Sequence, residues 1–135
     1  MALSIAAERR LLQAVVAVAA VVPITGGLAG VLLGVGLDSR QTAGAADLDS
    51  HWRYLSGLLL GIGLAAWASV ARIEAMGARF RLIALIVVGG GLGRLCSLAA
   101  VGRPSTLMLA ALVMELVITP ALAVWHHRFV HRCAS

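Results

Sequence analysis

The sequence predicts an all-α fold, an integral membrane bundle of four transmembrane helices in up-down-up-down order with both termini cytoplasmic. Composition is the first reason, since 61% of the 135 residues are hydrophobic and 13% are charged, against roughly 45–50% and about 25% in soluble domains. The second reason is that four long apolar runs are separated by charged connections. A chain of this size cannot bury so much apolar surface in water and must use lipid as its solvent. Its length predicts a single domain over residues 1–135.

The first predicted span covers residues 11–35, which contain no charged side chain. At about 1.5 Å per residue this run is long enough to cross the roughly 30 Å hydrocarbon layer. Arg9 and Arg10 would also suit a signal peptide, but the apolar region of a signal peptide is only about 7–15 residues long. We therefore expect a retained span. Its glycines recur at every fourth residue and predict a smooth face for a neighbouring helix: Gly26, Gly30 and Gly34.

A polar segment over residues 36–53 precedes the second predicted span, residues 54–71. The segment is too polar to enter the bilayer. The span contains Gly57 and Gly61 at the spacing that lets two helices approach closely, so we predict that these glycines also contact a helix. The start of the span is a polar head that combines acidic, basic and aromatic groups: Asp49, His51, Arg53 and Tyr54.

The third and fourth predicted spans cover residues 82–101 and 106–125. A connection of only a few residues joins them, so the two helices are expected to be antiparallel neighbours. Ser105 stands directly before the fourth span, where its side chain can cap the first helical turn.

Arginine distribution predicts the orientation of the chain. The N-terminus, the second connection and the C-terminal tail together hold seven arginines, whereas the first and third connections hold three. Because arginine is enriched on the cytoplasmic side of membrane proteins, both termini should be cytoplasmic, and the polar head should face outward.

Arg94 in the third span and Glu115 in the fourth are the residues whose placement costs most. The penalty for an ionisable side chain at bilayer depth is at least about 2.5–3.5 kcal/mol on insertion scales, so such residues usually find a partner. Counting back from the short turn places the two side chains within reach of each other, and we predict a buried ion pair. Two interpretations stay open. The pair either fixes the register of two helices, or Arg94 anchors an anionic ligand with Glu115 as counter-ion or proton acceptor.

The polar head is the second candidate group. His51 and Tyr54 share one helical face with Gly61, which would suit the interior of a bundle. The alternative is an interfacial collar in which Trp52 and Tyr54 lie at headgroup depth and Arg53 meets lipid phosphate. Combining both groups, we predict a ligand-binding site, open to the outer side, made of His51, Arg53, Tyr54, Arg94 and Glu115. No catalytic residue is assigned.

Metal, cofactor and nucleic-acid chemistry are not predicted. Cys96 and Cys133 form no CxxC motif, and the glycine run at residues 89–93 lies within a span, unlike a nucleotide-binding loop. His127 and His131 have the spacing of a metal-binding pair, but no third ligand is organised around them, so a solvated basic tail is the simpler interpretation. The arginines are scattered at the ends of apolar runs, which argues against nucleic acid.

Three segments carry a resemblance to a known family: DSHWRYLSGLLLGIG, VVGGGLGRLCSL and ALVMELVITPALAVW. In order and spacing they resemble the small bacterial membrane proteins of domain-of-unknown-function family 4345. The resemblance implies a four-helix protein of the bacterial cytoplasmic (inner) membrane, related at a distance to the DoxX-like group, and no activity comes with it. The positions that match the family's pattern are His51, Arg53, Tyr54, Gly57, Gly61, Arg94, Glu115 and Pro120.

Three functions are compatible with these observations. The first is a module that binds or carries a small amphipathic or anionic molecule. The second is an accessory subunit that docks a larger membrane complex through its glycine faces. The third is a small membrane enzyme that transfers a proton on a lipid-like substrate. The expected partners are accordingly the lipid bilayer, a small amphipathic ligand or lipid, and a membrane protein partner or a second copy in a homo-oligomer.

Overall fold

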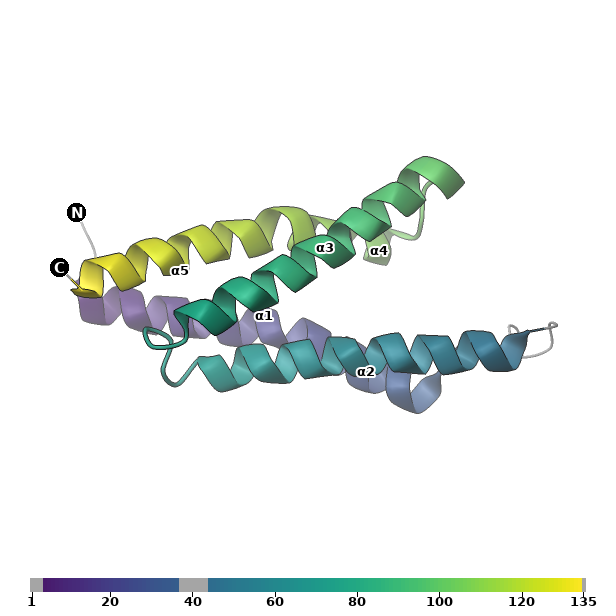
Figure 1. Ribbon diagram of the computed structural model, residues 1–135, viewed down its shortest axis with the longest axis horizontal. Helices are drawn as coiled ribbons and strands as arrows, with labels where there is room; N and C mark the ends of the chain where they lie inside the picture. The colour runs from purple at the N-terminus through teal and green to yellow at the C-terminus, as the bar shows by residue number, and fades with distance from the viewer. Residues whose placement is uncertain (1–3, 37–43, 135) are drawn as a thin grey trace. The chain divides into compact units, whose positions relative to one another are not determined.

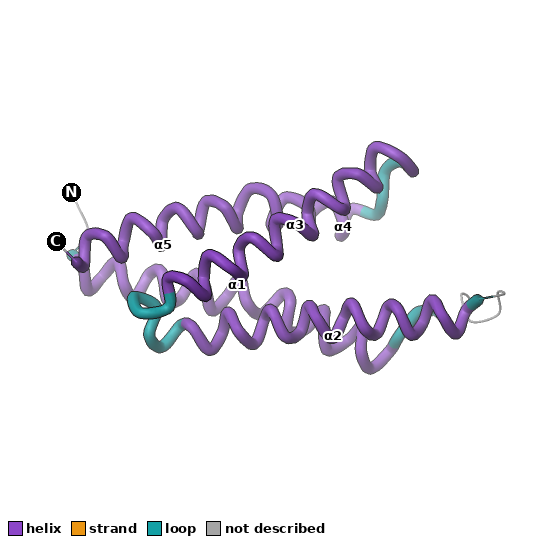
Figure 2. Tube along the Cα trace, in the orientation of Figure 1, coloured by secondary structure: helices purple, strands orange, loops and turns teal. Residues whose placement is uncertain are grey.

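A computed structural model describes residues 4–36 and 44–134 of the chain, and all regular structure within these ranges is helical (Figures 1 and 2). The helices are α1 (Ile5–Leu33), α2 (Ala45–Ser69), α3 (Gly77–Val101), α4 (Thr106–Val113), η2 (Met114–Ile118) and α5 (Thr119–Ala134). The last three follow one another without a break, so the described residues form four helices in all. Part of the predicted outer connection over residues 36–53, namely residues 37–43, lies outside the described ranges.

Three of these helices are long and apolar enough to cross a membrane. They are α1, α3 and the continuous helix Thr106–Cys133. The prediction of a helical membrane protein is therefore confirmed. The second helix, α2, is not among the three because its first turns carry the charges of the polar head. That α2 forms the fourth span stays a prediction.

The chain divides into two compact units, Gln13–Val70 and the combination of Met1–Leu12 with Ala71–Ser135. The first unit contains most of α1 together with α2. The second contains α3, α4, η2 and α5 together with the first turns of α1. The single domain expected over residues 1–135 stays a prediction.

In the first unit α1 and α2 are antiparallel, and glycines set their separation. A Cβ atom on Gly27 would lie 2.8 Å from Leu60 Cα, and a Cβ atom on Gly63 would lie 2.8 Å from the Ile24 nitrogen. Real Cβ atoms do not approach backbone this closely, so any side chain at either position would push the helices apart. Neither glycine was singled out from the sequence.

The glycines that were predicted to contact a helix lie in different environments. A Cβ on Gly30 would collide with the Ser56 side chain, and Gly34 lies against the side chains of Asp49 and Arg53. Gly26 and Gly57 each have one side-chain neighbour, at 4.0 and 3.9 Å, and Gly61 has no atom within 4 Å of the Cβ position among the described residues. Close helix contact in this unit is therefore made at Gly27, Gly30 and Gly63.

In the second unit α3 is antiparallel to the helix that runs from α4 to α5. Gly91 of α3 lies against Glu115 and Leu116 of η2, and near the other end Phe80 stacks on His126. Gly102, with φ of 114°, reverses the chain after α3 in a conformation that glycine adopts without strain. Ser105 then caps α4 by accepting a hydrogen bond from the Met108 N–H at 3.5 Å, as predicted.

The π-helical turn η2 has an identifiable cause. Pro120 has no N–H, so the regular hydrogen bond to the carbonyl four residues earlier cannot form. The N–H of Thr119 instead reaches back five residues to the Met114 carbonyl, which also accepts a bond from Thr119 Oγ1 at 2.9 Å. This wider turn contains Glu115, and turns of this kind are frequent at functional sites.

Candidate functional site

Arg94 and Glu115 lie together in the second unit. Arg94 Nε, on α3, is 3.0 Å from Glu115 Oε1, on η2. The guanidinium also reaches α4, where Nη1 lies 2.9 Å from the sulfur of Met108. The Glu115 side chain is 16% exposed and that of Arg94 is 39% exposed, so the carboxylate is largely covered and the guanidinium is only partly so.

Gly91 allows this approach. It precedes Arg94 by about one helical turn, and a Cβ atom there would lie 2.9 Å from the Cβ of Glu115. Because glycine has no side chain, η2 can come close enough to α3 for the carboxylate to reach the guanidinium. The other glycines of the run lie in open space, with no atom of the described chain within 4 Å of their Cβ positions: Gly89, Gly90 and Gly93.

Both partners of this pair have hydrogen-bonding capacity left over. Glu115 Oε2 is buried and has no hydrogen-bond partner among the described residues. Arg94 uses Nε and Nη1, and within the same ranges Nη2 makes no hydrogen bond. A guanidinium offers five donors and a carboxylate about four acceptor sites, so the arrangement can receive one more anionic group at Arg94.

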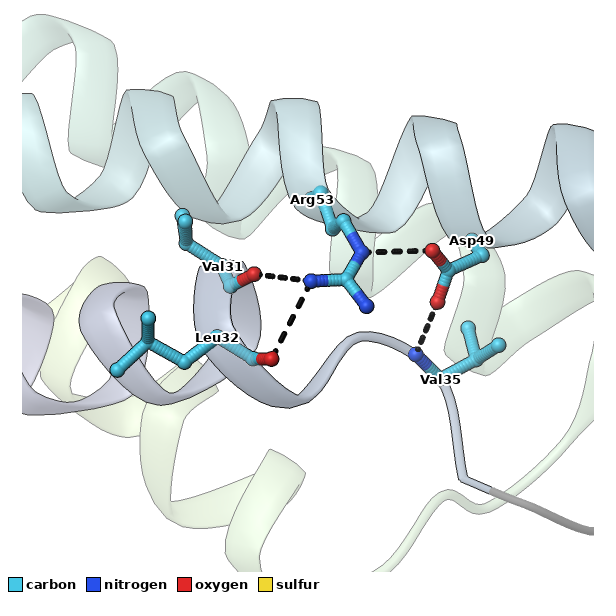
Figure 3. A network of polar contacts seen from close by, with 5 residues as sticks. All are labelled: Val31, Leu32, Val35, Asp49 and Arg53. Atoms are coloured by element: carbon cyan, nitrogen blue, oxygen red, sulfur yellow. Dashed lines mark hydrogen bonds and ion pairs between the residues drawn. The ribbon is translucent and has the colours of Figure 1, made fainter.

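A second polar cluster lies in the first unit, where α2 meets the end of α1 (Figure 3). Arg53 Nε lies 2.6 Å from Asp49 Oδ2, and Asp49 Oδ1 accepts a hydrogen bond from the Val35 N–H at 3.0 Å. Arg53 Nη1 donates to the carbonyl oxygens of Val31 and Leu32, the latter at 3.3 Å. The last carbonyls of a helix have no partner within it, and here the arginine of a neighbouring helix supplies one.

His51 and Tyr54 lie on a different face of α2 from this cluster. The face that meets α1 carries the buried residues Ser56 and Gly63. His51 is exposed, and Tyr54 is 62% exposed. The structure thus brings Arg53 to Asp49 in one unit and Arg94 to Glu115 in the other. The joint ligand site predicted from the five residues stays a prediction.

Sequence reasoning missed a polar cluster in the second unit. Glu8 is 6% exposed, and its Oε1 accepts hydrogen bonds from Trp125 Nε1 at 2.8 Å and from Arg132. His126 is 1% exposed; its Nε2 lies 2.7 Å from the Ile73 carbonyl oxygen, and its ring is stacked on Phe80 at 4.5 Å. The interpretation of the C-terminal segment as a solvated tail is therefore wrong at His126, because α5 continues to Ala134 and buries one of its faces.

The fold and this geometry define a class, helical membrane proteins with an arginine–glutamate pair between neighbouring apolar helices. Residues 11–126 match the family described as "Domain of unknown function (DUF4345)". Because the match covers most of the chain, the protein belongs to this family, as the sequence resemblance indicated. No curated protein and no solved structure matches the chain.

Proposed function

We propose that this protein is a membrane-embedded binding protein that holds the anionic group of a small amphipathic molecule at Arg94, with Glu115 as the counter-ion. The observation that carries the proposal is the unsatisfied state of the pair. Arg94 Nη2 makes no hydrogen bond to the described residues, while Glu115 Oε2 is buried without a partner. An anion at Nη2 would add a charge-assisted hydrogen bond that the resting protein lacks.

The details of the pair favour binding over a purely structural role. A pair that only fixes helix register gains most from a two-pronged contact in which both carboxylate oxygens are satisfied. Here one oxygen alone meets the guanidinium, and another donor is directed to the sulfur of Met108, which is a weak acceptor. Such a guanidinium can exchange a weak partner for a ligand's phosphate, carboxylate or sulfate oxygen.

The position that we propose for this site in the membrane rests on the charge distribution and hydropathy of the chain. Crossing of the membrane by α2 would complete a four-span, up-down-up-down bundle, and the arginine distribution favours cytoplasmic termini. Arg94 would then lie in the outer half of the membrane, with the site open to the outer side. A bacterial cytoplasmic membrane and a distant relation to DoxX-like proteins complete the proposal, and the sequence resemblance supports both.

The experiment compares the molecules that remain bound to purified full-length variants. Wild-type protein extracted in mild detergent should carry an anionic amphipathic species, detected by native mass spectrometry and identified after solvent extraction. Arg94→Ala should lose it. Arg103→Ala, which removes an exposed arginine from the nearby turn, should keep it. Absence of any such species from wild type, or its retention by Arg94→Ala, would contradict the proposal.

A matched variant covers the risk that Arg94→Ala misfolds. Removing the arginine alone leaves Glu115 charged and unpaired, which is strongly destabilising in a buried setting. Arg94→Gln combined with Glu115→Gln removes both charges and keeps polar groups of similar size. If this neutral variant folds with wild-type helicity and still retains the ligand, Arg94 does not anchor it.

A specific observation also favours the accessory-subunit alternative. Gly89, Gly90 and Gly93 leave part of α3 without side chains, and no atom of the described residues lies within 4 Å of their Cβ positions. A helix of another membrane protein could approach this surface closely. Gly93→Leu would block such an approach. If cross-linking in native membranes captures a partner that this variant loses, while the Arg94 variants keep it, docking is the better account.

A further inference from the structure

A second set of functional groups gathers on α5, roughly 20 Å along the helix from Glu115. Five side chains line an open hollow of about 600 Å³: Trp125, His127, Arg128, His131 and Arg132. The apolar helix Thr106–Cys133 is long enough to cross a membrane, and this hollow lies at its C-terminal end. Tryptophan and arginine at the end of a span mark the level of the lipid headgroups.

This polar hollow adjoins an apolar one on the same helix. A second hollow, of about 470 Å³, is lined by Pro120, Ala121 and Val124, and it shares Trp125 and Arg128 with the first. The chemistry of the lining therefore changes along α5, from cationic at the helix end to aliphatic toward the middle of the span. A molecule that fills both hollows needs an anionic head and an apolar chain.

Of the two arginines that line the hollow, Arg128 is the one whose charge no described acidic side chain balances. Glu8 is the acidic group in contact with these residues, and it is buried beneath Arg132 and Trp125, both of which bind its Oε1. This contact balances the charge of Arg132 and fixes the indole ring. Arg128 is exposed and makes no ion pair within residues 4–36 and 44–134. His127 and His131 stand beside it with their rings 4.4 Å apart, edge to face.

We propose that this surface binds an anionic phospholipid, with the lipid phosphate at Arg128 and the start of an acyl chain along Pro120 and Val124. The apolar hollow that continues toward the span favours a lipid over soluble phosphate, which would use only the cationic part. The site is separate from the one proposed at Arg94 and does not depend on it. It would hold a lipid at the membrane surface next to the contact that joins α5 to Glu8.

Trp125 provides a direct measurement of which lipid lies at the site. In full-length protein carrying Trp52→Phe and Trp67→Phe, Trp125 is the remaining tryptophan, and brominated lipid acyl chains quench tryptophan fluorescence on contact. The protein is placed in phosphatidylcholine vesicles that contain a minor fraction of phosphatidylglycerol, and either lipid is brominated in turn. We expect the quenching to show a preference for phosphatidylglycerol of about fivefold, the weight of one arginine at an anionic membrane surface.

Arg128→Gln should reduce this preference to about one, whereas Arg10→Gln, which removes another exposed arginine, should leave it unchanged. Equal loss in both variants would show general charge attraction and would overturn the proposal, as would a wild-type preference near one. Millimolar inorganic phosphate should not displace the brominated phosphatidylglycerol. If it does, the site takes free phosphate and the lipid assignment is wrong. Because Arg94 is untouched in all these variants, the outcome is independent of the ligand test at that residue.

Discussion

Arg53 of α2 donates a hydrogen bond from Nη1 to the carbonyl oxygen of Val31, in the last turn of α1. No basic side chain of α1 itself lies in that turn, so the cation that complements the negative end of the helix comes from its neighbour. Asp49 holds the guanidinium from the other side and also accepts from the Val35 N–H. Asp49 and Arg53, which are one helical turn apart on α2, thus bind the end of α1.

Loss of this contact should destabilise the first unit. Arg53→Leu leaves the Val31 and Leu32 carbonyls without their donor and Asp49 without its cation, and we expect the free energy of unfolding to fall by about 1–3 kcal/mol. Denaturation in detergent micelles, followed by circular dichroism, measures this. Arg53→Lys should recover part of the loss through its charge, since it cannot bond to Asp49 and the carbonyls in the same planar fashion. If Arg53→Leu unfolds like wild type, the contact contributes nothing.

Alanine substitutions at two glycines of α2 should affect the free energy of unfolding differently. At Gly63 the new methyl group would collide with the backbone of Ile24 on α1, and we expect a loss of about 1–3 kcal/mol as the helices separate. At Gly61 no atom of the described residues lies within 4 Å of the Cβ position, so alanine should be neutral or stabilise the helix by up to about 1 kcal/mol. The two substituted positions are two residues apart on the same helix, and the same unfolding experiment compares the variants. Equal effects of the two substitutions would show that the close approach of α1 does not restrict the side chain at Gly63.

Composition and hydropathy were enough to predict the helical membrane class, but they could not predict where the helices end. The first span was expected to begin at residue 11, yet α1 begins at Ile5. Its extra turns carry Glu8, which is buried through contacts with Trp125 and Arg132, residues more than a hundred positions away. A hydropathy pattern ends where charges begin, whereas a helix continues wherever tertiary partners satisfy those charges.

The same limit applies to the candidate sites. The proximity of Arg94 and Glu115 is set by a short turn, and residue counting is sufficient to estimate it. The role of Asp49 and Arg53 is not local, because their partners lie at the end of another helix. Nor could spacing show that Gly27 and Gly63, and not Gly57 and Gly61, meet a backbone, since every fourth residue of a helix offers the same face whichever face is buried.

Removal of the buried histidine ring should cost far more than removal of its exposed neighbour. His126→Ala would leave a cavity beside Phe80 and deprive the Ile73 carbonyl of its partner, so we expect a loss of about 2–4 kcal/mol in the free energy of unfolding. His127→Ala, one position along the same helix, should change it by less than about 0.5 kcal/mol because His127 is exposed. Comparable losses in the two variants would mean that His126 is not buried in the folded protein.

Glu115→Gln separates the two interpretations of the Arg94 pair, because they predict opposite results. Glutamine keeps an oxygen that can accept from Arg94 Nε but removes the negative charge that competes with a bound anion. If Glu115 is the resting counter-ion of a ligand site, the amount of anionic amphipathic molecule that co-purifies should rise, by roughly fivefold for about 1 kcal/mol of relieved competition. If the pair only fixes helix register, the variant should lose stability and bind nothing more than wild type.

Mass spectrometry of solvent extracts, normalised to protein, measures the amount of bound molecule, and unfolding in micelles measures the stability. Arg94→Ala is the reference, because a ligand held by Arg94 must be lost from this variant. If Arg94→Ala retains the ligand while Glu115→Gln gains none, the binding site lies elsewhere in the chain.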